Sequence, residues 1–290
     1  MKIAIGTATG NIGSFIAKEL SNTDNDLILL GRNFSKLKNL EVTNAKLIQL
    51  DSLNANDVIN ATRNCDALFW IIPPILTLES IEESYNKMIH SGATAVQQND
   101  IKRVVLVSSL GSNFPGNLST ISYVNKLENT FAAICKNVAV IRPGYFMENL
   151  LNQKDAILKN NRVECPFDEN HKIPFISTDD IGIIAANYLQ DKNWQGIIIK
   201  ELMGPEHLSM LDVVKMFSKM LNKNIKYKQI TYEEIKIQTA KMGLNNAIQI
   251  ELFNLYKALG DPKGIYSLPR TKEAFTPITL KNMINKKFLS

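Results

Sequence analysis

The sequence has few of the features that mark a membrane or secreted protein. Its 290 residues include three cysteines, Cys65, Cys135 and Cys165, which lie far apart and form no CxxC pair. An odd, scattered set predicts reduced thiols, as in a cytoplasmic protein. No run approaches the ~18 apolar residues of a membrane helix, and the N-terminus shows no apolar signal-peptide core or cleavage site. We therefore expect neither a membrane span nor a signal peptide.

Histidine is also scarce. His90, His171 and His207 share no ligand spacing with cysteines or acidic residues, so no metal site is expected. The sequence also lacks a Gly-x-Ser-x-Gly motif, which argues against an acyl-transfer nucleophile of that type.

The charge is weakly positive and dispersed. The formal net charge is +5, the lysines are interleaved with acidic residues, and the densest cluster is Lys281 to Lys287 at the C-terminus. This distribution predicts a solvated surface rather than a nucleic-acid site. Apolar residues make up 45% of the chain, which is ordinary for a globular protein of one large domain or a main domain with a small cap.

The N-terminus has the order strand, glycine turn, helix. Lys2 to Ile5 suits a buried parallel strand, and Ile12 to Leu20 has helical periodicity. This order opens a dinucleotide-binding βαβ unit, in which backbone N–H groups and the helix N-terminus hold a pyrophosphate. The spacing is GxxxGxxG, and glycines also close ordinary turns. The residues predicted to contact a cofactor here are Thr7, Thr9, Gly10, Asn11, Ile12 and Gly13.

The second predicted strand, Leu27 to Leu30, ends at a basic residue. In a dinucleotide fold, the residue after this strand meets the adenosine ribose. Arg32 offers a fork of donors suited to a 2′-phosphate, and Lys36 adds a charge one helical turn later. The pair favours NADP(H), with NAD(H) possible; the alternative is a surface arginine at a strand end.

Strands and helices then alternate. Further strands are expected at Leu47 to Leu50, Ala67 to Ile72 and Arg103 to Val107, with helices at Asn54 to Ala61 and Glu79 to Gln98. Alternation predicts a doubly wound α/β fold with a parallel sheet, whose ligands bind beyond the carboxyl ends of the strands. Asp51 and Ser52 read as a helix N-cap that could touch the adenine; Ile72 and Pro73 are predicted beside the nicotinamide half.

A helix predicted from Ser119 to Lys136 carries Tyr123 and Lys126. Short-chain dehydrogenases use a tyrosine and a lysine four residues apart as their acid–base pair. Here the spacing is three, which still places both on one helix face. We predict both as catalytic residues, with Lys126 also near the cofactor ribose; the alternative is that Tyr123 packs and Lys126 is solvated.

The sixth predicted strand, Val138 to Ile141, runs into RPGYFMEN at positions 142–149. This segment resembles the RPGxFMEN stretch of the NmrA-like family, an atypical branch of the short-chain dehydrogenase/reductase superfamily. The resemblance extends from Met1 to about Tyr232. It includes the Thr-Gly-Asn-Ile-Gly loop, Arg32-Asn33 with Lys36, Pro73-Pro74, the segment Ser177 to Ile181 and the turn Gly204-Pro205-Glu206.

The resemblance implies a Rossmann domain over residues 1–143, with later elements interleaved, and a mainly substrate-binding α/β cap over 144–290. It implies NADP(H) as the preferred cofactor, with Tyr145 at the cofactor and Phe146 and Asn149 at the substrate. In the ether-reductase relatives a lysine near the position of Lys126 is the catalytic base. The family loop reads GATGxxG, so Thr7 replaces its first glycine, and Gly6 could supply the turn one residue early.

Beyond Asn149 the pattern is less regular. One helix is expected to end near Lys159. Further helices are expected at Ile181 to Leu189, at Met210 to Leu221 and over most of Glu233 to Leu259. Strands are expected at Gly196 to Lys200 and Ile225 to Gln229, and Val163 to Ile176 is expected to be loop-like. No flexible linker is visible, so the cap is expected to pack directly on the main domain.

Three functions are consistent with these features. The leading one is an NADP(H)-dependent oxidoreductase of a small carbonyl, enone or quinone. The second is a non-catalytic NADP(H)-sensing protein that acts on a protein partner, and the third and weakest is a nucleotide-sugar epimerase. In each case the expected ligands are small molecules, not nucleic acid or membrane.

Overall fold

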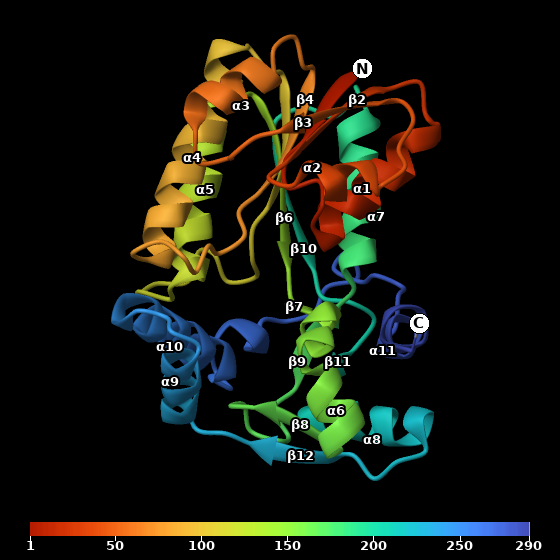
Figure 1. Cartoon of the computed structure of the whole chain (residues 1–290), viewed down its shortest axis with the longest axis vertical. Coiled ribbons are helices and arrows are strands. Elements are labelled where there is room, and N and C mark those ends of the chain that lie inside the picture. Colours follow the sequence, from red (N-terminus) through yellow and green to blue (C-terminus); the bar gives the residue numbers. More distant parts are fainter. Residues whose placement is uncertain (290) are drawn as a thin grey trace.

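A seven-stranded parallel sheet forms the centre of the computed structural model, which describes residues 1–289 (Figure 1). Its strand order is β10-β6-β5-β4-β1-β2-β3, and every neighbouring pair is parallel. The strands are β1 (Lys2–Ile5), β2 (Asp26–Gly31), β3 (Ala45–Gln49), β4 (Ala67–Ile71), β5 (Arg103–Val107), β6 (Asn137–Pro143) and β10 (Ile197–Leu202). The predicted doubly wound α/β fold is confirmed.

Helices cover both faces of this sheet. One layer holds α3 (Ala55–Ala61), α4 (Ile81–Gln98) and α5 (Thr120–Ile134); the other holds α1 (Asn11–Glu19), α2 (Phe34–Lys38) and α7 (Thr178–Gln190) (Figure 1). Successive strand residues alternate between the two layers. In β1, Ile3 and Ile5 pack under α1 and α7, whereas Ala4 packs under α3–α5. Both faces are apolar because both are buried.

The helix after β3, α3, begins within one residue of the predicted start, but its N-cap is not the one that the sequence predicts. Asp51 accepts a hydrogen bond from the Leu53 amide (3.1 Å) and so shapes the turn before the helix. The N-cap of α3 is Asn54, whose side chain accepts from the amides of Asn56 and Asp57. The prediction that Asp51-Ser52 is the cap was therefore wrong by about three residues.

The second half of the chain builds a smaller α/β lobe below the first (Figure 1). It contains a three-stranded sheet, β11-β9-β7, and a parallel pair, β12-β8. Its strands are β7 (Tyr145–Phe146), β8 (Arg162–Cys165), β9 (Ile173–Ile176), β11 (His207–Leu208) and β12 (Lys226–Gln229). Its helices are α6 (Lys154–Asn160), α8 (Met210–Leu221), α9 (Tyr232–Lys241), α10 (Asn246–Gly260) and α11 (Leu280–Met283).

The segment from Val163 to Ile176 is not loop-like, because it contains most of β8 and all of β9. Pro174 suggests a break, since proline cannot donate to a strand ladder. In β9, however, the neighbouring strands meet it over only two residues each, and Pro174 lies opposite His207. Because each ladder is so short, the strand forms although Pro174 has no N–H group to donate.

The C-terminal segment is fastened to the junction of the two lobes. Lys287 donates to Glu148 Oε1 (2.7 Å) and to Asp179, and Lys286 donates to Asp179 Oδ2 (3.0 Å). Burial alone would lower the pKa of Lys287, but its bonds to Asp179 and Glu148 outweigh burial and raise it. The carboxyl groups are therefore paired, as buried charges must be.

A second buried ion pair joins β6 to α5. Arg142 donates two hydrogen bonds to the Glu128 carboxylate, from Nε to Oε1 (3.0 Å) and from Nη2 to Oε2 (2.6 Å). The Ser108 hydroxyl, just after β5, also donates to Glu128. Only about a tenth of either charged side chain is exposed, 10% for Arg142 and 8% for Glu128. Removing one member would leave a buried charge without its partner.

We expect Glu128→Gln to lower the free energy of unfolding by about 3 kcal/mol, because Arg142 loses its counter-charge in a buried site. The matched control is Asp155→Asn, which removes the exposed Asp155–Lys159 pair and should cost at most about 0.5 kcal/mol. Urea denaturation of both variants measures the difference. Equal, small effects would show that the Glu128–Arg142 pair contributes little to stability.

Candidate functional site

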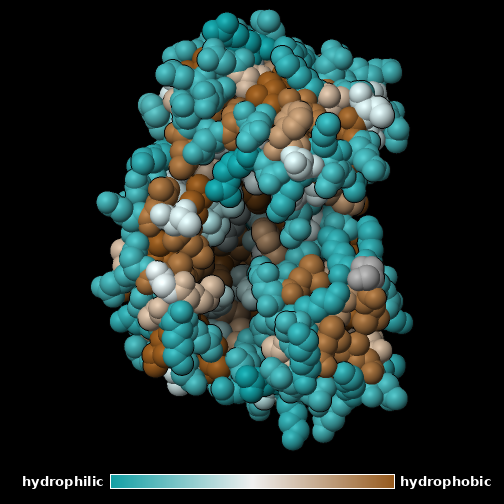
Figure 2. Space-filling model, in the orientation of Figure 1, coloured by the Kyte–Doolittle hydropathy of each residue, from teal (hydrophilic) through white to brown (hydrophobic). Residues whose placement is uncertain are grey.

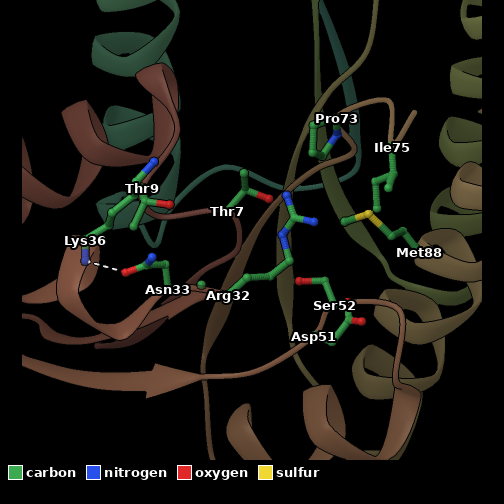
Figure 3. Close-up of a pocket in the computed structure, with 11 residues that line it drawn as sticks. Thr7, Thr9, Arg32, Asn33, Lys36, Asp51, Ser52, Pro73, Ile75 and Met88 are labelled. Carbon is green, nitrogen blue, oxygen red and sulfur yellow. Dashed lines mark hydrogen bonds between the residues drawn. The ribbon is translucent and has the colours of Figure 1, made fainter. Parts of the chain in front are cut away.

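A pocket lies at the carboxyl edge of the central sheet, where β1, β2, β3 and β4 end (Figure 3). It brings together seven residues that the sequence predicts at a cofactor: Thr7, Thr9, Arg32, Lys36, Asp51, Ser52 and Pro73. These residues come from four separate loops. The carboxyl-edge rule for parallel sheets predicts this convergence.

The loop after β1 is tightly built around Thr7. Its φ is +53°, in the left-handed region where a β-branched residue is strained. The Thr7 carbonyl accepts from the Gly10 amide (2.9 Å), and the Ala8 amide donates to Leu30 O (3.0 Å). A Cβ on Gly13 would lie 2.4 Å from the Thr7 carbonyl oxygen, so only glycine fits there.

Gly6 does not supply the turn, because its φ is not positive and Thr7 adopts that conformation itself. Position 6 requires glycine for a different reason, which is the close packing of its neighbours. A Cβ there would lie 2.8 Å from the Trp70 ring and 3.0 Å from Phe69 O. The expectation that Gly6 compensates for Thr7 is therefore wrong.

The N-terminus of α1 opens beside this loop. Gly10 is its N-cap and makes no side-chain cap hydrogen bond, and no acidic residue lies in the first turn. Within residues 1–289, the amides of Asn11, Ile12 and Gly13 have no hydrogen-bond acceptor. Free amides at a helix N-terminus favour an anion.

Two cations face the same pocket. The Arg32 guanidinium points into it, toward Thr7 and Pro73, and the Lys36 side chain extends beside Thr9 (Figure 3). Asn33 caps α2 by accepting from the Lys36 amide (2.9 Å), which fixes the helix that carries Lys36. Neither cation has a hydrogen-bond or ion-pair partner in the described part of the chain. Both are free to meet a phosphate.

The far wall of the pocket is apolar. Ile75 and Met88 line it beside Pro73, and sequence reasoning missed both (Figure 3). Met88 lies on the inner face of α4, where its helical spacing reads as core packing. Ile72, predicted at the cofactor, is only 4% exposed and packs in the core under α3–α5 instead of lining this pocket.

Tyr123 and Lys126 lie away from this pocket. The Tyr123 hydroxyl donates to Glu251 Oε1 of α10 (2.8 Å), and Lys126 Nζ donates to Asn86 Oδ1 of α4 (2.8 Å). Burial and the hydrogen bond to Glu251 raise the pKa of Tyr123 above its ordinary value. A raised pKa keeps the phenol protonated, the opposite of an activated base. A catalytic role for either residue stays a prediction and requires these contacts to break.

Glu251 does more than hold Tyr123. Its carboxylate also accepts from the amides of Ile81 (2.7 Å) and Glu82 (3.0 Å), the first two residues of α4. A carboxylate at a helix N-terminus is favoured by the free amides and the helix dipole. The Glu251 side chain therefore connects α10 to both α4 and α5.

A deep hollow lies between the two lobes, with hydrophobic residues along one wall and its floor (Figure 2). Helix α10 contacts both lobes. Near its start, Ile248 and Leu252 pack against the core under α3–α5; near its end, Leu255, Tyr256 and Leu259 belong to the core of the second lobe.

Tyr145 and Phe146 point to different lobes. Tyr145 packs edge-on against Phe167 and Phe175, with ring centroids 6.1 and 5.3 Å apart, in the second lobe. Burial raises the pKa of its phenol, although a hydrogen bond with Asn149 acts in the opposite direction. Phe146 packs against the core under α1 and α7. This places Tyr145 with Asn149 in the second lobe, and the predicted contact of Tyr145 with the cofactor stays a prediction.

The cysteines and histidines form no centre with these residues. All three cysteines are free and buried, and burial raises the pKa of Cys65 to about 11 and that of Cys165 to about 12. Over residues 1–289 no group of three or more His, Cys, Asp or Glu side chains could hold a metal ion. None of the helices in that range combines the length and apolarity that crossing a membrane requires.

The chain belongs to the NmrA-like family, whose model matches residues 1–274. It is 22% identical to prestalk A differentiation protein A of Dictyostelium discoideum, over 97% of this chain and 93% of that protein. It is also 22% identical to an NAD(P)H azoreductase of Xenophilus azovorans, over 90% of this chain and 88% of that protein.

Solved structures share the fold over nearly the whole chain. A nucleoside-diphosphate-sugar epimerase of Staphylococcus aureus has a TM-score of 0.81 at 15% identity, covering 99% of this chain and 100% of that chain. A triphenylmethane reductase of Citrobacter sp., complexed with NADP(H), has a TM-score of 0.78 at 14% identity, covering 99% of each chain. An NADPH-dependent quinone oxidoreductase of Escherichia coli has a TM-score of 0.77 at 19% identity, covering 99% of each. At these identities the likeness shows the fold alone.

The strained loop yields a stability prediction. Thr7→Gly should raise the free energy of unfolding by about 1 kcal/mol, because left-handed strain of ~1–3 kcal/mol exceeds the ~0.5–1 kcal/mol entropic cost of glycine. Thr9→Gly is the matched control, since Thr9 has no positive φ and should lose about 0.5–1 kcal/mol. Thermal and urea unfolding measure both. Loss of stability in Thr7→Gly would show that Thr7 is not strained.

Proposed function

We propose that this protein is an NADP(H)-dependent reductase of a small carbonyl, enone or quinone. The observation that carries the proposal is the free cation pair, Arg32 and Lys36, facing a pocket formed by four strand-end loops. The azoreductase relative and the two reductase structures support the reaction class by their names alone. The amphipathic character of the hollow between the lobes suits an aromatic or conjugated substrate.

In this proposal each part of the pocket holds one part of the cofactor. The amides of Asn11, Ile12 and Gly13 would receive the pyrophosphate, and Gly10 and Thr9 would allow its approach. Arg32 would bind the 2′-phosphate through its fork of donors, with Lys36 as a second charge. Asp51 and Ser52 would border the adenine, and Pro73 would lead toward the nicotinamide half.

The cofactor supplies the hydride, so the protein has only to orient it and shield the reaction from water. In this proposal the chain would do so because the pocket lies at the carboxyl edge of the sheet and the partly hydrophobic hollow opens between the lobes. Tyr145 and Asn149 lie on the substrate side in this proposal, and Phe146 packs toward the dinucleotide lobe. The Tyr145 phenol stays protonated and so is suited to donate a hydrogen bond rather than to act as a base.

One observation favours the alternative of an NADP(H) sensor without turnover. Both predicted acid–base residues, Tyr123 and Lys126, are engaged by other side chains outside the pocket. The same observation opposes an epimerase, because that chemistry depends on an activated tyrosine–lysine pair. Turnover with a panel of quinones and enals separates a reductase from a sensor.

The cofactor proposal predicts a selective loss. Arg32→Ala should weaken NADPH binding about 10- to 100-fold while leaving NADH binding unchanged, because it removes a charged bond to the 2′-phosphate alone. Calorimetric titration with both nucleotides measures this. The matched control is Lys38→Ala, which removes an exposed lysine of α2, the helix after Arg32, that does not line the pocket. Unchanged NADPH affinity in Arg32→Ala would remove the basis for the cofactor preference.

The position of Tyr123 predicts that its hydroxyl is structural. Tyr123→Phe should cost about 1.5 kcal/mol of stability, because a bond to the Glu251 carboxylate is lost. NADPH oxidation at a temperature where the variant is folded should stay within about twofold of the native rate. A much larger fall in kcat with an unchanged Tm would instead establish Tyr123 as a catalytic residue.

A further inference from the structure

A second groove lies on the opposite lobe from the cofactor pocket, between α8 and the C-terminal segment. Its walls are Lys215, Met216, Lys219 and Met220, with Asp212, from α8, and Lys281 and Asn285 from α11 and the following turn. The hollow has a volume of about 550 Å³. We call it the α8–α11 groove. The space-filling view shows a hydrophobic patch in this region, beside the C-terminus (Figure 2).

The groove has an apolar floor. Met216 and Met220 are one helical turn apart and half-buried against the core of the second lobe. Beneath them Phe217 packs edge-on against Phe288, with ring centroids 4.9 Å apart, which fixes α8 against the C-terminal turn. Methionine side chains adapt to different apolar partners, so this floor can accept protruding side chains of a ligand.

The rim of the groove is positive. Lys215 and Lys219 lie on one side and Lys281 on the other, all exposed and all without a hydrogen-bond or ion-pair partner among residues 1–289. The one acidic residue among those that line the groove is Asp212, whose carboxylate accepts from Lys172 and from the amide and hydroxyl of Ser209, the N-cap of α8; these bonds lower its pKa to about 2. The groove therefore presents three uncompensated positive charges above two methionines.

We propose that the α8–α11 groove binds an acidic amphipathic helix of a partner protein. Two apolar side chains one turn apart would occupy the floor beside Met216 and Met220, and flanking carboxylates would meet the three lysines. A membrane surface fits less well, because Met216 and Met220 are half-buried whereas the three lysines around them are exposed. The proposal is independent of the reductase function, since the groove shares no residue with the cofactor pocket.

The test uses a fluorescein-labelled helical peptide of about 16 residues, with leucines at helical spacing on one face and glutamates elsewhere. Native full-length protein should bind it saturably in fluorescence anisotropy, with affinity that falls as salt rises. The double variant Lys215→Glu/Lys219→Glu should weaken binding at least about tenfold, because two attractions become repulsions. Met216→Ser/Met220→Ser should weaken it similarly while keeping the charge.

The matched control is Lys18→Glu/Lys192→Glu, which reverses two exposed lysines whose ammonium groups have no partner within residues 1–289, and it should bind like the native protein. Thermal unfolding and NADPH titration check that every variant is folded. Equal weakening in the control would show non-specific charge attraction and overturn the proposal, as would no saturable binding by the native protein. Preferential binding to phosphatidylserine vesicles that the same variants abolish would assign the groove to a membrane surface instead.

Discussion

Parallel pairing of all seven central strands is the constraint on which the rest of the structure depends. Because the strands run in one direction, every connection after a strand begins at the same edge. The glycine loop, Arg32, Asp51 and Pro73 meet there although up to 66 residues separate them. Both sheet faces are buried by helices, so this edge is where a ligand can reach the backbone of the sheet.

The second lobe is held at that same edge by three connections of different kinds. The chain crosses directly from β6 into β7, the Lys287 ammonium bonds Glu148 and Asp179, and α10 packs into both cores. Through Glu251, α10 also accepts from the first amides of α4, whose inner face contributes Met88 to the pocket. A shift of α10 would therefore change its contacts with α4 and with the cores of both lobes.

Local patterns in the sequence predict most of the first lobe. Short continuous apolar runs identify its strands, and the glycine spacing and Arg32 identify residues at the edge where the pocket lies. The rest depends on contacts that no local pattern contains. The Tyr123 hydroxyl donates to Glu251, 128 positions away. Pro174 makes its segment read as a loop, although the segment forms a strand with two-residue ladders. The direction of Tyr145 depends on a two-residue strand, too short to show periodicity.

Thr7 shows how the cofactor loop keeps its shape without the family's first glycine. The conformation is enforced from outside the residue: its carbonyl accepts from Gly10, the next amide bonds Leu30 O, and Gly13 packs against the same carbonyl. These contacts over-determine the backbone, so a threonine is held at φ +53° despite its Cβ. The cost falls on stability rather than on loop shape, because the first amides of α1 still have no hydrogen-bond acceptor among residues 1–289 and stay available to an anion. The departure from the glycine pattern therefore does not argue against anion binding here.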